Sequence, residues 1–279
     1  MKSYWELTKP GILFGNAITA IAGFLFASRG CVDFWRFLAA LAGLLCVIGS
    51  ACVCNNCIDR EMDSKMKRTR NRPLVKRVIS LQNAIIFAVP LGIVGALLLG
   101  FYTNLLTLAI ALFGFFIYVA IYSPLKYRSL HGTVVGSISG GVPPVVGYCA
   151  VTDQFDTAAL ILFIIVTLWQ MPHFFAIALY RLDDYMAAGI PVLPLEKGAR
   201  ATKIQMLLYI VALLVALSML TLFGYTGYLY LVVTLLLGLG WLWLCIQGFW
   251  AKNDKIWGRN MFLASLVVVM GFSLMISLV

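Results

Sequence analysis

Residues 37–74 read FLAALAGLLCVIGSACVCNNCIDREMDSKMKRTRNRPL, and this stretch decides the fold. Its first part, residues 37–56, carries no charged side chain, whereas the remainder holds three acids and six bases. A helix needs roughly 20 predominantly apolar residues to cross a bilayer. The stretch therefore predicts a membrane-spanning helix that ends in a polar and strongly basic segment on one side of the membrane.

The rest of the chain has the same character. Of its 279 residues 62% are hydrophobic and only 11% are charged, and the mean hydropathy is +0.96. Because hydrocarbon has no water to satisfy backbone groups, the apolar runs should be helices. We predict an all-α polytopic membrane protein, one domain over residues 1–279. Its nine expected transmembrane helices lie at residues 11–28, 37–56, 83–101, 104–122, 134–151, 158–180, 204–223, 229–249 and 261–278.

The positions of Lys and Arg predict the orientation. If the N-terminus is cytoplasmic, the segments on that side hold every one of the 21 bases except Arg29 and Arg36, as the positive-inside rule requires. The net charge of +10 follows from this topology, so no nucleic-acid partner is expected. The simplest location is the inner (plasma) membrane of a bacterium.

Three polar residues continue the register of the second predicted span. Asn55, Asp59 and Asp63 are spaced i, i+4 and i+8, so on a continuous helix they share one face. Their oxygens suit Mg²⁺, which typically takes one or two carboxylates and fills its remaining positions with water and substrate phosphate. Since about 12 Å of helix separates Asn55 from Asp63, we expect either two ions, or one ion and a hydrogen-bonding Asn. An exposed acidic loop is the alternative.

The bases that follow predict a diphosphate site beside the metal. Arg offers a planar fork that matches phosphate oxygens, and Lys supplies a point charge. A second loop of the same predicted side adds two further bases. The expected diphosphate-binding residues are Lys67, Arg68, Arg70, Arg72, Lys126 and Arg128. The alternative role of such bases is only to enforce the topology.

A second polar cluster lies at the end of the sixth predicted span. Asp183 and Asp184 are expected to complete a metal site that faces the first stripe, because even-numbered spans end on the same side. His173 lies inside an apolar run, where a polar residue is costly and usually functional. It is a candidate ligand of a metalloporphyrin iron, a candidate base, or a side chain that hydrogen-bonds across helices.

The fifth predicted span contains the sequence SISGGVPPVVGY, in which paired glycines and prolines break the helix. Irregular backbone at membrane depth is tolerated only where protein or a cavity surrounds it. The break therefore indicates a substrate chamber inside the bundle.

These motifs together resemble a known family. The Asn-x-x-x-Asp-x-x-x-Asp pattern at residues 55–63, with MKRTRNRPL, GGVPPVVGY, WQMPHF and DYMAAGIPVLP, is similar to the UbiA-type intramembrane prenyltransferases. The first pattern marks the superfamily, whereas MKRTRNRPL with WQMPHF resembles its heme-modifying branch, the protoheme IX farnesyltransferases or heme O synthases. The resemblance runs from LTKPGI near the N-terminus to at least Pro194.

The resemblance implies a nine-helix bundle around a central cavity, Mg²⁺ as cofactor, and transfer of a farnesyl group from farnesyl diphosphate to a vinyl group of heme B. Water adds as well, and the products are heme O and diphosphate. It places Asn55, Asp59 and Asp63 on the first metal-diphosphate motif and Asp184 on the acid of the second. The predicted catalytic residues are these four and His173. Further implied partners are the lipid bilayer and contact with a heme-modifying enzyme or a terminal oxidase assembly.

The sequence departs from the family pattern twice. Only Asp183 and Asp184 stand where relatives often carry a fuller aspartate motif, and the loop at Lys126 reads LKYR where adjacent Lys-Arg is expected. Two other functions are compatible with parts of the sequence. One is a UbiA-type enzyme with an aromatic acceptor such as 4-hydroxybenzoate, and the other is a membrane transporter with broken helices. Against a transporter, the ionisable residues gather at one predicted membrane face and not at the midplane.

Overall fold

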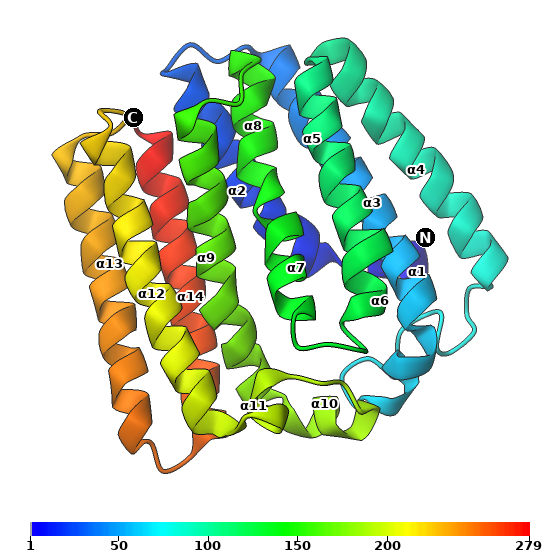
Figure 1. The fold of residues 1–279 in the computed structure, drawn as a ribbon. Coiled ribbons are helices and arrows are strands. Elements are labelled where there is room, and N and C mark those ends of the chain that lie inside the picture. The colour runs from blue at the N-terminus through cyan, green and yellow to red at the C-terminus, as the bar shows by residue number, and fades with distance from the viewer. Residues whose placement is uncertain (1) are drawn as a thin grey trace.

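The computed structural model describes residues 2–279, so Met1 of the predicted domain lies outside them, and in this range every regular element is helical. Seven long helices each run without interruption across the bundle (Figure 1). They are α2 (Pro10–Ser28), α3 (Phe34–Lys65), α4 (Leu81–Tyr102), α9 (Thr157–Tyr180), α12 (Gly198–Leu222), α13 (Tyr228–Gln247) and α14 (Asp254–Ser277). The short helices α1 (Lys2–Leu7), α10 (Leu182–Ala188) and α11 (Leu193–Glu196) flank them.

Two further spans are composite. One joins α5 (Leu105–Phe116), a π-helical turn at Ile117–Tyr122 and α6 (Ser123–Leu125), and the other joins α7 (Gly132–Gly140) to α8 (Val142–Thr152). A short 3-10 turn at Gly248–Trp250 ends the eighth span. Within residues 2–279 nine helical segments are therefore long and apolar enough to cross a membrane, which confirms the nine predicted spans. The protein is a multi-pass membrane protein.

The helices begin where polar side chains cap them. Asp33 and Asn253 each accept hydrogen bonds from two backbone amides, at the starts of α3 and α14. Ser80, Asn104 and Asp156 each accept one, at the starts of α4, α5 and α9. An N-cap oxygen satisfies amides that have no partner inside the helix. The caps therefore fix the residue at which each of these apolar runs becomes helical.

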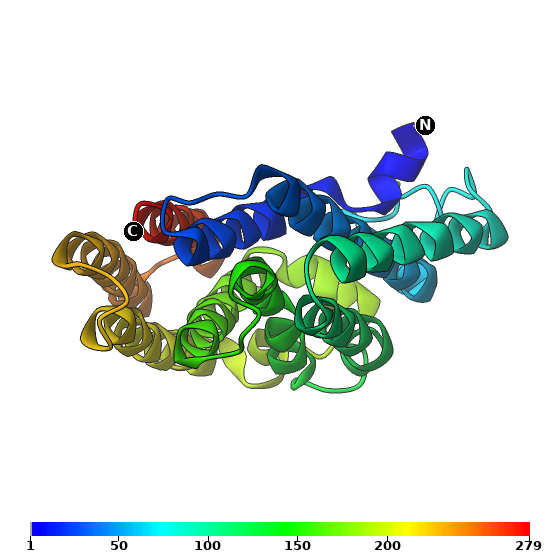
Figure 2. The same cartoon turned by 90° about the horizontal axis from the view of Figure 1, so that it is seen from above.

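Seen from above, α2 and α3 lie along one side of the bundle, and α5, α8 and α9 lie along the other (Figure 2). The two sides meet where α2 packs on α8, and glycine permits the close approach. A Cβ atom on Gly23 would lie 2.0 Å from the backbone oxygen of Pro144, and one on Gly147 would lie 2.0 Å from that of Ala20. Small residues at membrane helix interfaces allow backbones to approach in this way.

A cavity of about 820 Å³ lies between these helices. Its walls come from α2, α3, α5, α7, α8, α9, α14 and the π-helical turn, and Arg68 and Arg72 lie at its boundary. The predicted break of the fifth span is present, because α7 ends at Gly140 and α8 starts at Val142, and both residues line the cavity. The expected bundle around a central chamber is confirmed.

Candidate active site

Helix α3 carries the predicted polar stripe into the interior. The helix does not stop where the apolar run ends at residue 56 but continues to Lys65, so Asn55, Asp59 and Asp63 keep one register. Their exposed fractions are only 1%, 3% and 2%. Burying a charge is costly unless it is paired and hydrogen-bonded. The surroundings of this stripe must therefore supply compensating groups.

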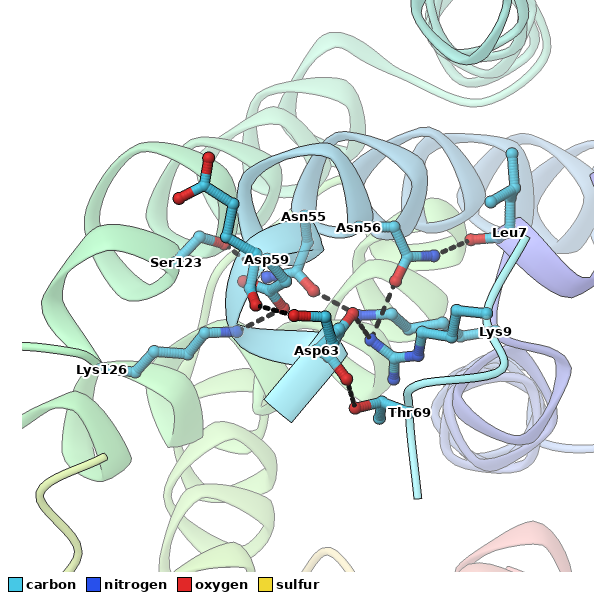
Figure 3. A network of polar contacts seen from close by, with 12 residues as sticks. Leu7, Lys9, Asn55, Asn56, Asp59, Asp63, Thr69, Ser123 and Lys126 are labelled. Atoms are coloured by element: carbon cyan, nitrogen blue, oxygen red, sulfur yellow. Dashed lines mark hydrogen bonds and ion pairs between the residues drawn. The ribbon is translucent and has the colours of Figure 1, made fainter. Parts of the chain in front are cut away.

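Each member of the stripe is bound to a different base (Figure 3). Lys126 Nζ lies 2.6 Å from Asp59 Oδ2, and Arg72 Nη1 lies 2.5 Å from Asp63 Oδ2. The third base is Lys9, whose ammonium group donates to Asn55 Oδ1. Two ion pairs and one hydrogen bond from an ammonium group to an amide oxygen thus form one cluster, which we call the charged cluster.

Neutral donors and acceptors complete the charged cluster. The Tyr127 hydroxyl donates to Asp59 Oδ1 at 2.5 Å, and Asn55 Nδ2 donates to Ser123 Oγ at 2.7 Å. Burial, and then the adjacent Asp59 carboxylate, raise the pKa of Tyr127, so this phenol stays protonated and acts as a donor. Asp59 is therefore held by two donors from the segment that follows α6.

Lys9 and Tyr127 are functional candidates that the sequence patterns did not single out. Lys9 lies in the left-handed backbone region, φ 55°, between α1 and Pro10 at the start of α2, and this break directs it toward α3. Burial lowers the pKa of Lys9 to about 8. The signal for Lys9 in the sequence is a lone base immediately before a proline, a pattern that the positive-inside rule also explains.

The two adjacent acids of α10 separate. Asp184 is buried and accepts a hydrogen bond from the backbone amide of Lys67 at 3.0 Å, which ties α10 to the loop after α3. Asp183 has a side chain 72% exposed and pairs with Lys255 at 2.8 Å, and this hydrogen bond lowers the pKa of the carboxyl. Successive helical residues point about 100° apart. The structure thus brings Asp184 toward the charged cluster and does not bring Asp183 there.

The predicted phosphate-binding bases also divide into two groups. Arg68 and Arg72 line the cavity, and Lys126 reaches the charged cluster. The other three, Lys67, Arg70 and Arg128, are exposed and do not line the cavity. Three of the six bases are therefore assembled at one place, and the other three lie on the surrounding surface.

His173 lies in the wall of the same cavity, on α9. Its Nδ1 atom is 2.7 Å from Ser265 Oγ on α14, and its ring stacks on Trp169 with centroids 4.8 Å apart. The cavity therefore joins a charged end, at Arg68 and Arg72, to an aromatic region around His173. Such a volume suits a substrate with one anionic head and a large apolar part.

The donors of the charged cluster fit Mg²⁺ shared with a phosphate group. The candidate ligands are the carboxylate oxygens of Asp59 and Asp63 and the amide oxygen of Asn55. A hard cation such as Mg²⁺ uses one or two carboxylates and completes its shell with water and phosphate oxygens. Within residues 2–279 no three His, Cys, Asp or Glu side chains gather closely enough to form an all-protein metal site. Asp59 and Asp63 would each hold an ion only together with a polyphosphate.

An all-helical membrane bundle with buried acids and bases at one end of a cavity defines a class of intramembrane enzyme, and comparison with known proteins identifies it. The model of the UbiA prenyltransferase family matches residues 16–266, so the chain belongs to this family. It is a prenyltransferase, and the transporter alternative does not apply.

The curated relatives share one name. The protoheme IX farnesyltransferase of Protochlamydia amoebophila (strain UWE25) is 54% identical over 273 residues, which cover 98% of this chain and 96% of the relative. The protoheme IX farnesyltransferase of Cronobacter sakazakii (strain ATCC BAA-894) is 50% identical over 278 residues, covering 99% and 94%.

Solved structures share the fold. A structure described as digeranylgeranylglyceryl phosphate synthase superposes with a TM-score of 0.81 at 18% identity, covering 100% of this chain and 99% of that one. A UbiA homologue from Archaeoglobus fulgidus, bound to GPP and Mg²⁺, gives a TM-score of 0.73 at 14% identity and covers 98% and 99%.

Proposed function

We propose that the protein transfers a farnesyl group from farnesyl diphosphate to a vinyl group of heme B, with addition of water, and forms heme O and diphosphate. The observation that carries this proposal is the charged cluster at one end of an 820 Å³ cavity whose remaining wall is largely apolar. An anionic head would lie at the charged end of the cavity, and a long hydrocarbon chain would lie along its apolar wall. The shared name of the curated relatives supports heme B as the acceptor.

The reaction begins at the bond between the allylic carbon of farnesyl and the diphosphate oxygen. This bond breaks with its electron pair on oxygen, which leaves negative charge on diphosphate and positive charge on the farnesyl carbon. The vinyl π electrons then form the new carbon–carbon bond. The resulting cation on the porphyrin side takes up water and releases a proton, and this leaves the hydroxyl group of heme O.

The bases of the site stabilise the leaving group. Arg72 and Lys126 can exchange their carboxylate partners for diphosphate oxygens, and Arg68 borders the same cavity. Charge stabilisation by such groups is stronger in a site that excludes water. Tyr127 retains its hydrogen bond to Asp59 and keeps that carboxylate oriented.

Asp59 and Asp63 would hold Mg²⁺, with Asn55 and Asp184 nearby. The ion would act as a Lewis acid that stabilises the negative charge developing on diphosphate. These three acids and Asn55 are the catalytic residues of the proposal, with His173 at the acceptor. Asp183 has no part in it, because its carboxylate pairs with Lys255 on the surface. The Mg²⁺ named for the Archaeoglobus fulgidus homologue supports a divalent metal.

We propose further that residues 1–279 form one prenyltransferase domain in a bacterial inner membrane. The end of the bundle that carries the charged cluster, α10 and α11 faces the cytoplasm, together with the N-terminus, because nearly all Lys and Arg residues gather at that side. Contact with a heme-modifying enzyme or a terminal oxidase assembly stays a prediction.

The test is a reaction in membranes that contain the protein, supplied with heme B, farnesyl diphosphate and Mg²⁺. Porphyrins are extracted and resolved by mass, and a parallel sample offers 4-hydroxybenzoate in place of heme B. We expect a new species whose mass equals heme B plus one farnesyl group and one hydroxyl group. Prenylation of 4-hydroxybenzoate without any change in heme B would overturn the proposed acceptor.

A further inference from the structure

His173 is held rigidly inside the cavity, away from the charged cluster. It lies seven residues before Tyr180, the last residue of α9, so about 10 Å of helix separates it from that end. Its ring stacks on Trp169 at 4.8 Å and lies 5.1 Å from the ring of Phe262, both measured between centroids. The aromatic neighbours leave the imidazole one well-defined orientation.

The hydrogen bonds around His173 determine its tautomer. Ser265 has one hydroxyl proton, and it donates this proton to the backbone oxygen of Phe262 at 2.5 Å. The Ser265 oxygen must therefore act as acceptor in its 2.7 Å contact with His173 Nδ1. The proton of a neutral His173 is then on Nδ1, and Nε2 carries a free lone pair.

That lone pair has no internal partner. Across residues 2–279 no side chain or backbone group makes a hydrogen bond to His173 Nε2, although the residue lines the cavity. A side chain whose only role is to join helices would satisfy both ring nitrogens inside the protein. Here one nitrogen joins α9 to α14, and the other is left for a ligand.

Ser265 also holds the neighbouring ring. It is fully buried, and its backbone oxygen accepts a hydrogen bond from Trp169 Nε1 at 2.8 Å. Ser265 of α14 therefore orients the rings of both Trp169 and His173. Histidines that bind metals in proteins are characteristically oriented in this way, since they donate their second ring N–H to a fixed acceptor.

We propose that His173 Nε2 is the axial ligand of the iron in a metalloporphyrin acceptor. This inference rests on the proposed function, because it assumes that the acceptor is an iron porphyrin. Nε2 donates its lone pair to the iron, and no bond of the porphyrin changes. Ligation at the iron leaves the vinyl groups at the porphyrin edge free to meet the farnesyl carbon in the same cavity.

The experiment records the visible absorption and electron paramagnetic resonance spectra of purified protein titrated with heme B. The variants are His173→Ala, His173→Gly and, as a matched control, His131→Ala. The control removes the one other histidine, an exposed residue just before α7. We expect a nitrogen-ligated iron signal in the unaltered protein and in the control. His173→Ala should lose that signal, and added imidazole should restore it in His173→Gly.

A positioning variant tests the tautomer argument. Ser265→Ala keeps the imidazole but removes the acceptor at Nδ1, and loss of such an outer partner typically weakens metal binding by about 10–100-fold. We expect the heme dissociation constant to rise toward the lower end of this range, with the nitrogen-ligated spectrum retained at saturating heme. An unchanged dissociation constant would contradict the argument.

The outcomes separate this inference from the proposed function. If the unaltered protein forms heme O while His173→Ala keeps the same iron spectrum, the axial ligand is overturned and the farnesyl transfer stands. If the unaltered protein neither binds heme B nor modifies it, the proposed function itself fails. Binding of farnesyl diphosphate to His173→Ala shows that the variant is folded, so a lost iron signal then supports the ligand assignment.

Discussion

The Asp59–Lys126 pair allows structural and catalytic roles to be separated. The two charged groups are 2.6 Å apart, and their side chains are only 4% and 17% exposed. Removing one partner of a buried ion pair typically costs about 3–5 kcal/mol, because the other charge is left uncompensated. For Asp59→Asn we expect about 3 kcal/mol, the lower limit, since the new amide still accepts from Tyr127 and Lys126 retains some contact with water.

The double variant Asp59→Asn/Lys126→Met then removes both charges. Replacing both members of a buried pair by neutral groups of similar shape is often nearly neutral, so the loss in unfolding free energy should shrink to about 1 kcal/mol. Turnover should not recover, because the carboxylate proposed to hold Mg²⁺ and a base proposed to bind diphosphate are both absent. Loss of one group that stabilises developing charge typically lowers kcat by about 10²–10³-fold.

The assays are unfolding of the purified protein in detergent, followed by circular dichroism, and heme O formation by the same samples. We expect the double variant to regain stability relative to Asp59→Asn and to remain at least about 100-fold slower than the unaltered protein. If the double variant regains both stability and turnover, Asp59 is a structural residue and the metal-diphosphate assignment is refuted.

Three further predictions concern the interface, the second acid and the metal. Gly23→Ala should destabilise the fold by about 1–3 kcal/mol, because its Cβ would meet the Pro144 backbone. Gly15→Ala, with open space around it, should cost no unfolding free energy. Equal unfolding midpoints for the two variants would contradict this packing. Asp184→Asn should lower turnover strongly, and Asp183→Asn, on the surface, should leave turnover close to that of the unaltered protein. A larger loss of turnover in Asp183→Asn than in Asp184→Asn would contradict the assignment of Asp184 to the site. Removal of divalent metal with EDTA should stop diphosphate release and added Mg²⁺ should restore it, so metal-independent release would contradict the proposed cofactor.

Much of the fold follows from the sequence because membrane helices are specified locally. Apolar runs of sufficient length predict the spans, and the spacing of Asn55, Asp59 and Asp63 predicts their common face. This spacing also indicates that α3 continues beyond residue 56. Its full extent to Lys65 depends on bases from other segments that compensate the buried stripe.

The composition of the charged cluster could not be read from sequence spacing. Lys9 and Tyr127 reach it from a helix break and from a loop, and their positions depend on how α2 and α6 pack against α3. Asp183 and Asp184 are adjacent in sequence, yet only the packing of α10 decides which of them is buried. A charge that is needed for topology and one that is needed for chemistry look the same in a sequence.

Equilibrium binding of farnesyl diphosphate in the absence of heme tests the central assignment most directly, because no turnover interferes. The titration is performed with the unaltered protein and with Asp63→Asn, each with Mg²⁺ and with EDTA. If buried carboxylates hold the metal-diphosphate head, tight binding requires both Mg²⁺ and Asp63. Equal affinity in all four titrations would contradict that assignment.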